Sequence, residues 1–139
     1  MCSEALFING VYETVLQEIL QIQFVLPEQI LFLQPYASRP MVLLKENPPS
    51  IDSPMRLFVS LTDDLSHVHY EGEVVGWEDK RLLPKRKRDV LTHIIQVLQP
   101  DETGLYDASP TGKESINLLY VRRLRKLDVP FSVEQLTKI

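Results

Sequence analysis

Two central segments of the chain alternate apolar and polar residues, and this pattern constrains the fold more than any other feature. The first segment is MRLFVSLTDD (55–64) and the second is HVHYEGEVVGW (67–77). The alternating apolar residues are Leu57, Val59 and Leu61 in the first segment and Val68, Tyr70 and Val74 in the second. Because neighbouring side chains on a strand point to opposite faces, the pattern predicts two strands with one buried face each. The other face of the second strand is expected to carry His67, His69, Glu71, Glu73 and Trp77.

Helical spacing of apolar residues predicts two main helices. The first is expected at residues 10–22, with Asn9 as its cap. The second is expected in PKRKRDVLTHIIQVLQP, with Pro84 in its first turn and Pro100 at its end. Its apolar stripe consists of Val90, Leu91, Ile94, Ile95 and Leu98.

Shorter elements complete the prediction. We expect a short helix after Pro27, a strand at 41–44, a loop at 45–54, a central strand at 116–127 and a final short helix in which Ser132 and Gln135 form a capping box. This order predicts an α+β fold, a small curled sheet packed by helices. The whole chain, 1–139, is expected to form one domain, with 1–34 as a helical N-terminal extension.

Composition limits the classes of function. Hydrophobic residues make up 44% of the 139 residues, which is enough for a core, and the net charge is −4. A protein that is basic over its whole surface is therefore excluded, and only local basic patches remain. The single cysteine, Cys2, excludes an internal disulfide and a multi-cysteine zinc site. Without a secretory signal or a long apolar run, the expected location is the cytoplasm, with no membrane partner.

Basic residues cluster at the start of the second predicted helix, where cations oppose the helix dipole. This placement indicates that they hold phosphate groups. The predicted phosphate-binding residues are Arg39, Lys85, Arg86 and Arg88. A solvated helix start is the alternative. In the last strand, alternation predicts Arg123 and Arg125 on one face and Arg122 and Lys126 on the other.

Aromatic and polar residues at the ends of neighbouring strands suggest a site that stacks on a nucleobase and contacts its polar edge. The predicted base-pocket residues are Phe58, Ser60, Thr62, Asp63, Trp77, Tyr36 and Ser38. Each aromatic residue has a core position as its alternative.

The sequence offers little for catalysis. It has no G-x-S-x-G motif and no phosphate-cradling glycine loop, so we expect no enzyme, no cofactor and no metal. The alternative is a small metal-dependent enzyme using His67, His69 and Glu71, because two histidines and a carboxylate can form a metal triad.

The segment MRLFVSLTDDLSHVHYEGEVVGWEDKR resembles the middle of an EVE domain, a member of the PUA-like superfamily that also contains YTH readers. The C-terminal segment NLLYVRRLRKLDVPFSVEQLTKI is similar to the closing strand and short helix of that family. Together these segments cover roughly half of the chain. The resemblance implies a partly open PUA-like β-barrel whose pocket accepts a flipped, often modified base. In prokaryotes such modules are often linked to modification-dependent restriction.

These observations predict a non-catalytic module that reads a nucleobase, in DNA rather than RNA, as the sensor part of a restriction or defence system. The first alternative is a protein-interaction domain that forms a homodimer or binds an effector through the N-terminal helix.

Overall fold

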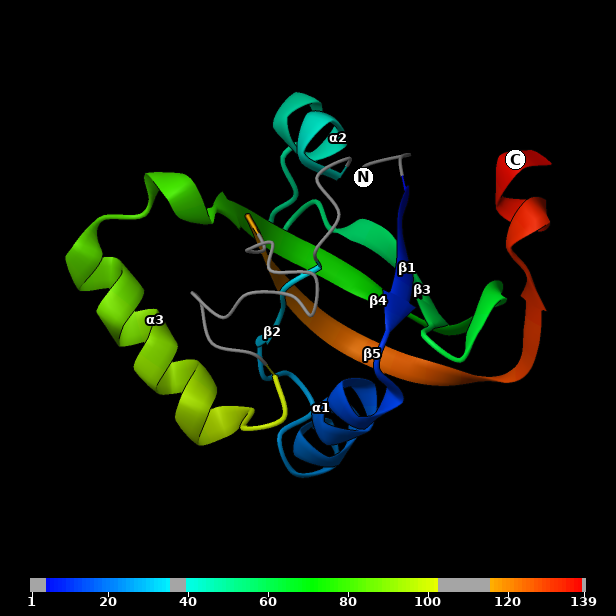
Figure 1. The fold of residues 1–139 in the computed structure, drawn as a ribbon, viewed down its shortest axis with the longest axis horizontal. Helices are drawn as coiled ribbons and strands as arrows, with labels where there is room; N and C mark the ends of the chain where they lie inside the picture. The colour runs from blue at the N-terminus through cyan, green and yellow to red at the C-terminus, as the bar shows by residue number, and fades with distance from the viewer. Residues whose placement is uncertain (1–4, 36–39, 103–115, 139) are drawn as a thin grey trace.

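A computed structural model describes residues 5–35, 40–102 and 116–138 of the chain. The elements in chain order are β1 (Ala5–Val11), α1 (Glu13–Val25), β2 (Leu31–Leu33), α2 (Pro40–Glu46), β3 (Met55–Leu61), β4 (Asp64–Asp79), α3 (Lys85–Leu98) and β5 (Asn117–Ser132). Short 3-10 helices follow β4 at Lys80–Leu82 and β5 at Val133–Lys138. Figure 1 shows the strands in the middle of the molecule, with α3 to one side.

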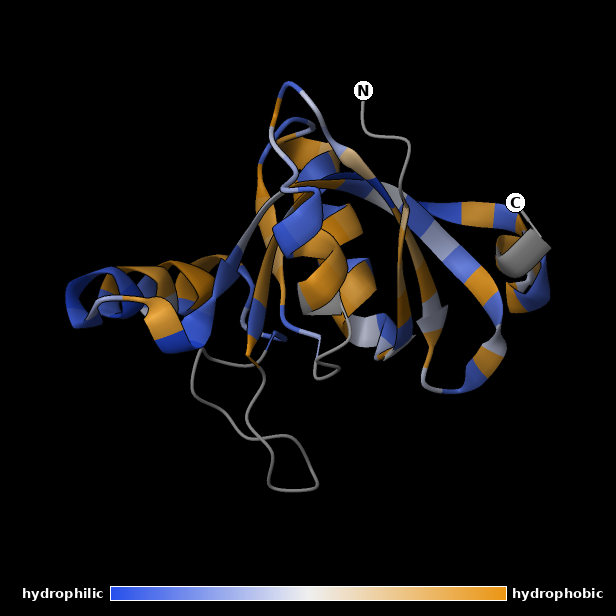
Figure 2. Cartoon of the chain, turned by 90° about the horizontal axis from the view of Figure 1, so that it is seen from above, coloured by the Kyte–Doolittle hydropathy of each residue, from blue (hydrophilic) through white to orange (hydrophobic). Residues whose placement is uncertain are grey.

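The five strands in the described part of the chain form one sheet in the order β1-β3-β4-β5-β2. β1 runs parallel to β3, and the other neighbouring pairs are antiparallel. β1 and β2 lie at the two edges, so the sheet is not closed into a barrel. Hydrophilic and hydrophobic bands alternate along the long strands (Figure 2). The predicted α+β class is confirmed, whereas the PUA-like assignment stays a prediction.

Two hydrophobic clusters hold the helices against the sheet. In the larger cluster, Leu16 and Ile19 of α1 and Leu44 of α2 pack with Val59 and Val121 of the sheet, all fully buried. The smaller cluster contains Phe32, Leu83, Leu91, Ile95 and Leu118. α3 therefore packs at the β2 edge of the sheet, where Leu91 and Ile95 supply its buried face.

A glutamine side chain completes the β2 edge. Phe32 donates its backbone N–H to Gln99 Oε1 at 2.7 Å, and Gln99 Nε2 donates to the Phe32 carbonyl at 2.9 Å. Gln99 is fully buried just beyond the end of α3. Its amide thus takes the place of a neighbouring strand for the outward-facing backbone groups of β2, which would otherwise be buried without partners.

The N-terminal region is more than the predicted helical extension, because it contributes two strands to the sheet. The prediction missed β1, and α1 starts at Glu13 rather than residue 10. Asn9 lies in β1 and is not a helix cap; the cap position belongs to Tyr12, which makes no side-chain cap hydrogen bond. Gly10 has φ of 85°, which explains how the chain leaves regular strand geometry before α1.

Three short predictions need correction. Residues 41–44 lie in α2 and not in a strand, and the segment after Pro27 forms a turn and then β2 instead of a helix. The final helix is a 3-10 helix in which Ser132 Oγ accepts a hydrogen bond from the Glu134 N–H at 3.3 Å. The predicted strands at 55–64 and 67–77 and the helix between Pro84 and Pro100 are confirmed as β3, β4 and α3.

None of the helices in the described ranges combines the length and apolar character needed to cross a membrane.

Candidate nucleic-acid interface

Phe58 is 6% exposed and packs inside the protein. Its ring meets the Phe131 ring edge-on, with centroids 5.9 Å apart and planes at 80°. The Arg56 guanidinium carbon lies 4.9 Å from the Phe58 ring centre. The Phe58 ring thus already contacts an aromatic ring and a cation. A base that stacked on Phe58 would have to displace one of them.

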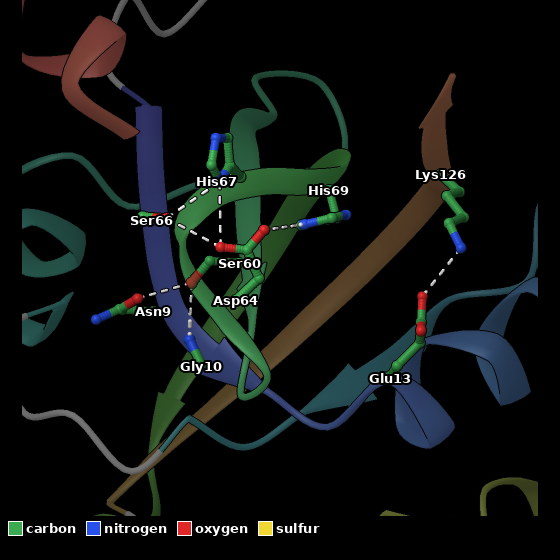
Figure 3. Close-up of polar contacts among 9 residues, drawn as sticks. All are labelled: Asn9, Gly10, Glu13, Ser60, Asp64, Ser66, His67, His69 and Lys126. Carbon is green, nitrogen blue, oxygen red and sulfur yellow. Dashed lines mark hydrogen bonds and ion pairs between the residues drawn. The ribbon is translucent and has the colours of Figure 1, made fainter. Parts of the chain in front are cut away.

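Ser60 has a structural role in fastening β1 to β3. It is fully buried, and its hydroxyl donates to Asn9 Oδ1 at 2.7 Å and accepts from the Gly10 N–H at 3.0 Å (Figure 3). Thr62 and Asp63 form the exposed turn between β3 and β4. These contacts satisfy the Ser60 hydroxyl as donor and as acceptor without a ligand.

Trp77 lies at the opposite end of the sheet from Ser60. Phe58 pairs with Glu71 in the sheet register, and Trp77 is six positions further along β4, which corresponds to about 20 Å. The register also shifts between Val74 and Gly76, so Trp77 packs against the larger core cluster and not on the face of Glu71. The prediction that Phe58, Ser60 and Trp77 share one pocket is therefore wrong, since no single base can reach both ends.

Buried polar residues surround the Trp77 end of the sheet. The indole N–H donates to Asn117 Oδ1 at 2.7 Å, and Lys80 Nζ donates to Gln34 Oε1 at 2.8 Å. Asn117 is fully buried, and Lys80 and Gln34 are 4% and 5% exposed. We name Gln34, Trp77, Lys80 and Asn117 the Trp77 cluster. The sequence prediction missed three of its members; the available signal was the presence of polar residues at the ends of apolar strands.

The basic start of α3 lies near the same end of β4 as Trp77 but on the other face of the sheet, because α3 packs in the smaller cluster and Trp77 packs against the larger one. Lys87 Nζ donates to the carboxylate of Glu78, the residue after Trp77. Lys85 and Arg86 are exposed, and neither forms an ion pair with another described residue. Arg88 is only partly exposed. Of the predicted phosphate-binding residues, Lys85 and Arg86 are therefore the accessible ones at this end.

Glu78 also links α3 to the last strand, because it accepts a hydrogen bond from the Tyr120 hydroxyl. Burial is the main cause, and this bond to Glu78 the second cause, of a Tyr120 pKa well above its usual value. Tyr120 therefore stays neutral at physiological pH and acts as a hydrogen-bond donor.

Tyr36, Ser38 and Arg39 lie outside the described residues.

The two histidines of β4 bind Asp64 rather than forming the predicted triad with Glu71. Asp64 Oδ1 lies 3.1 Å from His67 Nδ1, and Asp64 Oδ2 lies 3.0 Å from His69 Nε2 (Figure 3). Ser66 Oγ donates to Asp64 Oδ1 at 2.9 Å. The hydrogen bonds from His69, His67 and Ser66 lower the pKa of Asp64. This cluster ties the exposed β3–β4 turn together.

Glu71 is engaged on β5 instead, where its carboxylate accepts from Arg125 Nε at 2.5 Å. Among the described side chains, no group of three or more His, Cys, Asp or Glu residues has the geometry to hold a metal ion. The structure therefore does not bring His67, His69 and Glu71 together as a triad, since the histidines contact Asp64 and Glu71 contacts Arg125.

The arginines of β5 do not alternate as predicted. Arg123 has φ of 53°, so the strand is irregular there and the faces change. Arg122 Nε donates to Glu73 Oε1 at 2.8 Å, and Arg125 pairs with Glu71. Because Glu71 and Glu73 are two positions apart on β4, Arg122 and Arg125 lie on the same face of the sheet.

In comparisons with known proteins, no family model matches the chain, no curated protein matches it and no solved structure matches it.

Proposed function

We propose that the chain is a non-catalytic nucleic-acid-binding module of PUA-like type, which binds a nucleobase at the Trp77 cluster and the adjoining phosphates through Lys85 and Arg86. The sensor role in modification-dependent restriction, with DNA as the nucleic acid and a cytoplasmic location, belongs to this proposal. It rests on the resemblance of 55–81 and 117–139 to EVE domains.

The observation that supports the proposal is the position of Lys85 and Arg86. Both are exposed at the N-terminal end of α3, where each cation costs about 0.3–1 kcal/mol against the helix dipole. No acidic residue occupies the first turn of α3 to offset this cost. Phosphate groups would compensate the charge, and the Lys87–Glu78 bond joins this end of α3 to the residue that follows Trp77 on β4.

The Trp77 cluster supplies the stacking surface that base recognition needs. Trp77 is the only tryptophan and is partly exposed, so its ring offers a surface for stacking. Gln34, Lys80 and Asn117 are buried and hydrogen bonded within the cluster, so their role in the proposal is to hold the Trp77 ring in position rather than to contact the base. The proposed site is thus revised from Phe58 and Ser60 to Trp77 and the residues that position it.

The test is a titration of short single and double DNA strands, with and without methylated bases, followed by Trp77 fluorescence and by anisotropy of a labelled strand. Lys85→Gln with Arg86→Gln should weaken binding of every sequence and lower the salt slope by about 0.7–0.9 for each phosphate that is no longer bound. Lys126→Gln is the control, because Lys126 pairs with Glu13 away from this site. An unchanged salt slope in the double variant would refute the phosphate assignment.

Protein interaction through α1 is the second candidate function. Phe24 and Val25 at the end of α1 are 89% and 74% exposed, and Leu26 follows at 48%. An apolar group of this kind on a surface often marks an interface. Sedimentation at increasing concentration should show association that Phe24→Ser abolishes; a monomer at all concentrations would remove homodimerisation through α1.

A further inference from the structure

A shallow cavity lies on the face of the sheet opposite α1, away from the Trp77 cluster. Its volume is about 180 Å³, and it is lined by Arg56, Glu71, Gly72, Glu73 and Arg123. Pockets for drug-sized ligands have volumes of about 300–1,000 Å³. The size therefore suits a single small group rather than a whole organic ligand.

The two carboxylates of the cavity already have strong partners. Glu73 is paired in the sheet with Arg56 on β3 and with Arg122 on β5. Arg122 Nε donates to Glu73 Oε1 at 2.8 Å, and Glu71 accepts from Arg125 in the same way. Arg122 and Arg125 therefore neutralise the acidic residues from outside the cavity.

Arg56 retains hydrogen-bonding capacity. Its side chain is 70% exposed, and its closest ion-pair contact, Nη2 to Glu71 Oε2, is 4.0 Å, which is too long for a hydrogen bond. The Phe58 ring lies beneath the guanidinium at 4.9 Å and restricts its position. Arg56 is thus held at the cavity, while its N–H groups donate to no other described residue.

Arg123 reaches the cavity through an uncommon backbone conformation. Its φ of 53° is rare for a residue other than glycine, asparagine or aspartate, and such residues concentrate at functional sites. Gln23 maintains this conformation from α1: its side chain accepts from the Leu124 N–H at 2.8 Å and donates to the Leu124 carbonyl at 2.6 Å. The surrounding structure therefore supports a strained arginine.

Arg123 has two acidic partners, of which Glu28 is exposed to solvent. Its Nε and Nη2 donate to the Glu28 carboxylate at 3.2 and 3.4 Å, its Nη1 lies 3.7 Å from Glu73, and the Glu28 side chain is 67% exposed. Around the cavity, the four arginines 56, 122, 123 and 125 outnumber the glutamates 28, 71 and 73. The local charge is therefore positive, although the whole chain is acidic.

We propose that Arg56 and Arg123 bind an oxyanion, specifically a phosphate group, in this cavity. Guanidinium groups present forked N–H donors that match the oxygens of a phosphate, and two such groups on neighbouring strands can hold it from two sides. The site shares no residue with the interface of the Trp77 cluster, so the phosphate proposal can be tested independently of the proposed function.

The test is titration with inorganic phosphate, monitored by NMR shifts of the arginine Nε–H groups and by calorimetry. Arg56→Gln and Arg123→Gly should each weaken phosphate binding by about tenfold, since each removes charge-assisted hydrogen bonds. Arg123→Gly relieves the positive φ, so unfolding would not explain its loss of binding. Glu73→Gln should tighten binding, because it removes a negative charge from the cavity wall.

Lys126→Gln is the matched control, since Lys126 lies on β5 outside the cavity and pairs with Glu13. It should leave the phosphate affinity unchanged. No binding by the native protein, or equal affinity in Arg56→Gln, Arg123→Gly and the control, would overturn the proposal.

The source of the phosphate is distinguished by three further ligands: a mononucleotide, a short strand with a 5′-phosphate and the same strand without it. Arg56-dependent binding that is tightest for the mononucleotide identifies a small phosphate ester. Arg56-dependent binding that is tightest for a strand identifies nucleic acid. If Arg56→Gln changes the affinity of none of them, the site does not bind phosphate.

Discussion

Replacing Gln99, the residue that follows α3, should strongly destabilise the protein. The Gln99 amide makes two hydrogen bonds to the backbone of Phe32, at 2.7 and 2.9 Å, and both residues are buried. Removing the amide leaves a backbone N–H and a C=O without partners. Each unsatisfied group costs about 1–3 kcal/mol, so we expect the two groups together to lower the free energy of unfolding by about 2–6 kcal/mol.

Urea denaturation of three variants measures this loss and separates its causes. Gln99→Ala removes both the hydrogen bonds and side-chain volume, whereas Gln99→Leu keeps most of the volume and removes only the hydrogen bonds. Gln96→Ala is the control, because Gln96 is exposed near the end of α3 and its replacement should change stability by less than about 0.5 kcal/mol. A loss below about 1 kcal/mol in both Gln99 variants would refute the role of the amide as a substitute for a strand.

Further predictions concern backbone geometry and pH. Gly10→Ala should cost about 1–2 kcal/mol in urea denaturation, because φ is +85° and the new Cβ would lie 3.1 Å from Leu65; an unchanged midpoint would contradict this. Arg123→Gly should leave stability unchanged or raise it by up to about 1 kcal/mol, and a large loss would show that the positive φ is not strained. Hydrogen bonds from Tyr70, which has the larger effect, and from Lys126 hold the pKa of Glu13 below 4.5 in the folded protein. The ionised Glu13 carboxylate therefore contributes its full stabilisation above pH 4.5, and this contribution is lost as the pH falls through the pKa of the folded protein. Glu13→Gln should flatten the measured dependence of the free energy of unfolding on pH in that range.

The elements that the sequence predicts well are those whose signal is local. α3 has apolar residues at helical spacing over several turns and a proline at each end, so both its type and its limits are correct. β3 and β4 alternate regularly over most of their length. By contrast, the four apolar residues at 41–44 suit a strand or a helix equally, and only their packing against the core makes them helical.

The elements that the sequence misses depend on distant partners. β1 pairs in parallel with β3, about fifty residues away, and its Asn-Gly pair reads locally as the start of a helix. β2 has only three residues and relies on Gln99 and β5 for its hydrogen bonds. The positive φ of Arg123 also changes which side chains of β5 share a face, and no local sequence pattern indicates this angle.

The candidate site shows the same division. The sequence identifies Trp77 and the basic start of α3 as neighbours along the chain, and the Lys87–Glu78 bond joins α3 to the residue after Trp77, although α3 and the Trp77 ring lie on opposite faces of the sheet. It does not reveal Asn117 at the start of β5, which accepts from Trp77, or Gln34 just after β2, which accepts from Lys80. Phe58 and Ser60 have suitable side chains for a base pocket, but the register of β3 and β4 places them at the wrong end of the sheet.

The Gln99 amide also determines how copies of this protein can associate through their strands. It occupies the outward-facing backbone groups of β2, so a foreign strand finds no free partners at Phe32. Within the described residues β1 pairs only with β3 and keeps its second side open. In the language of polymer chemistry, Phe32 is therefore an end-capped position on this edge, whereas the second side of β1 is a reactive end to which a strand of another copy can add.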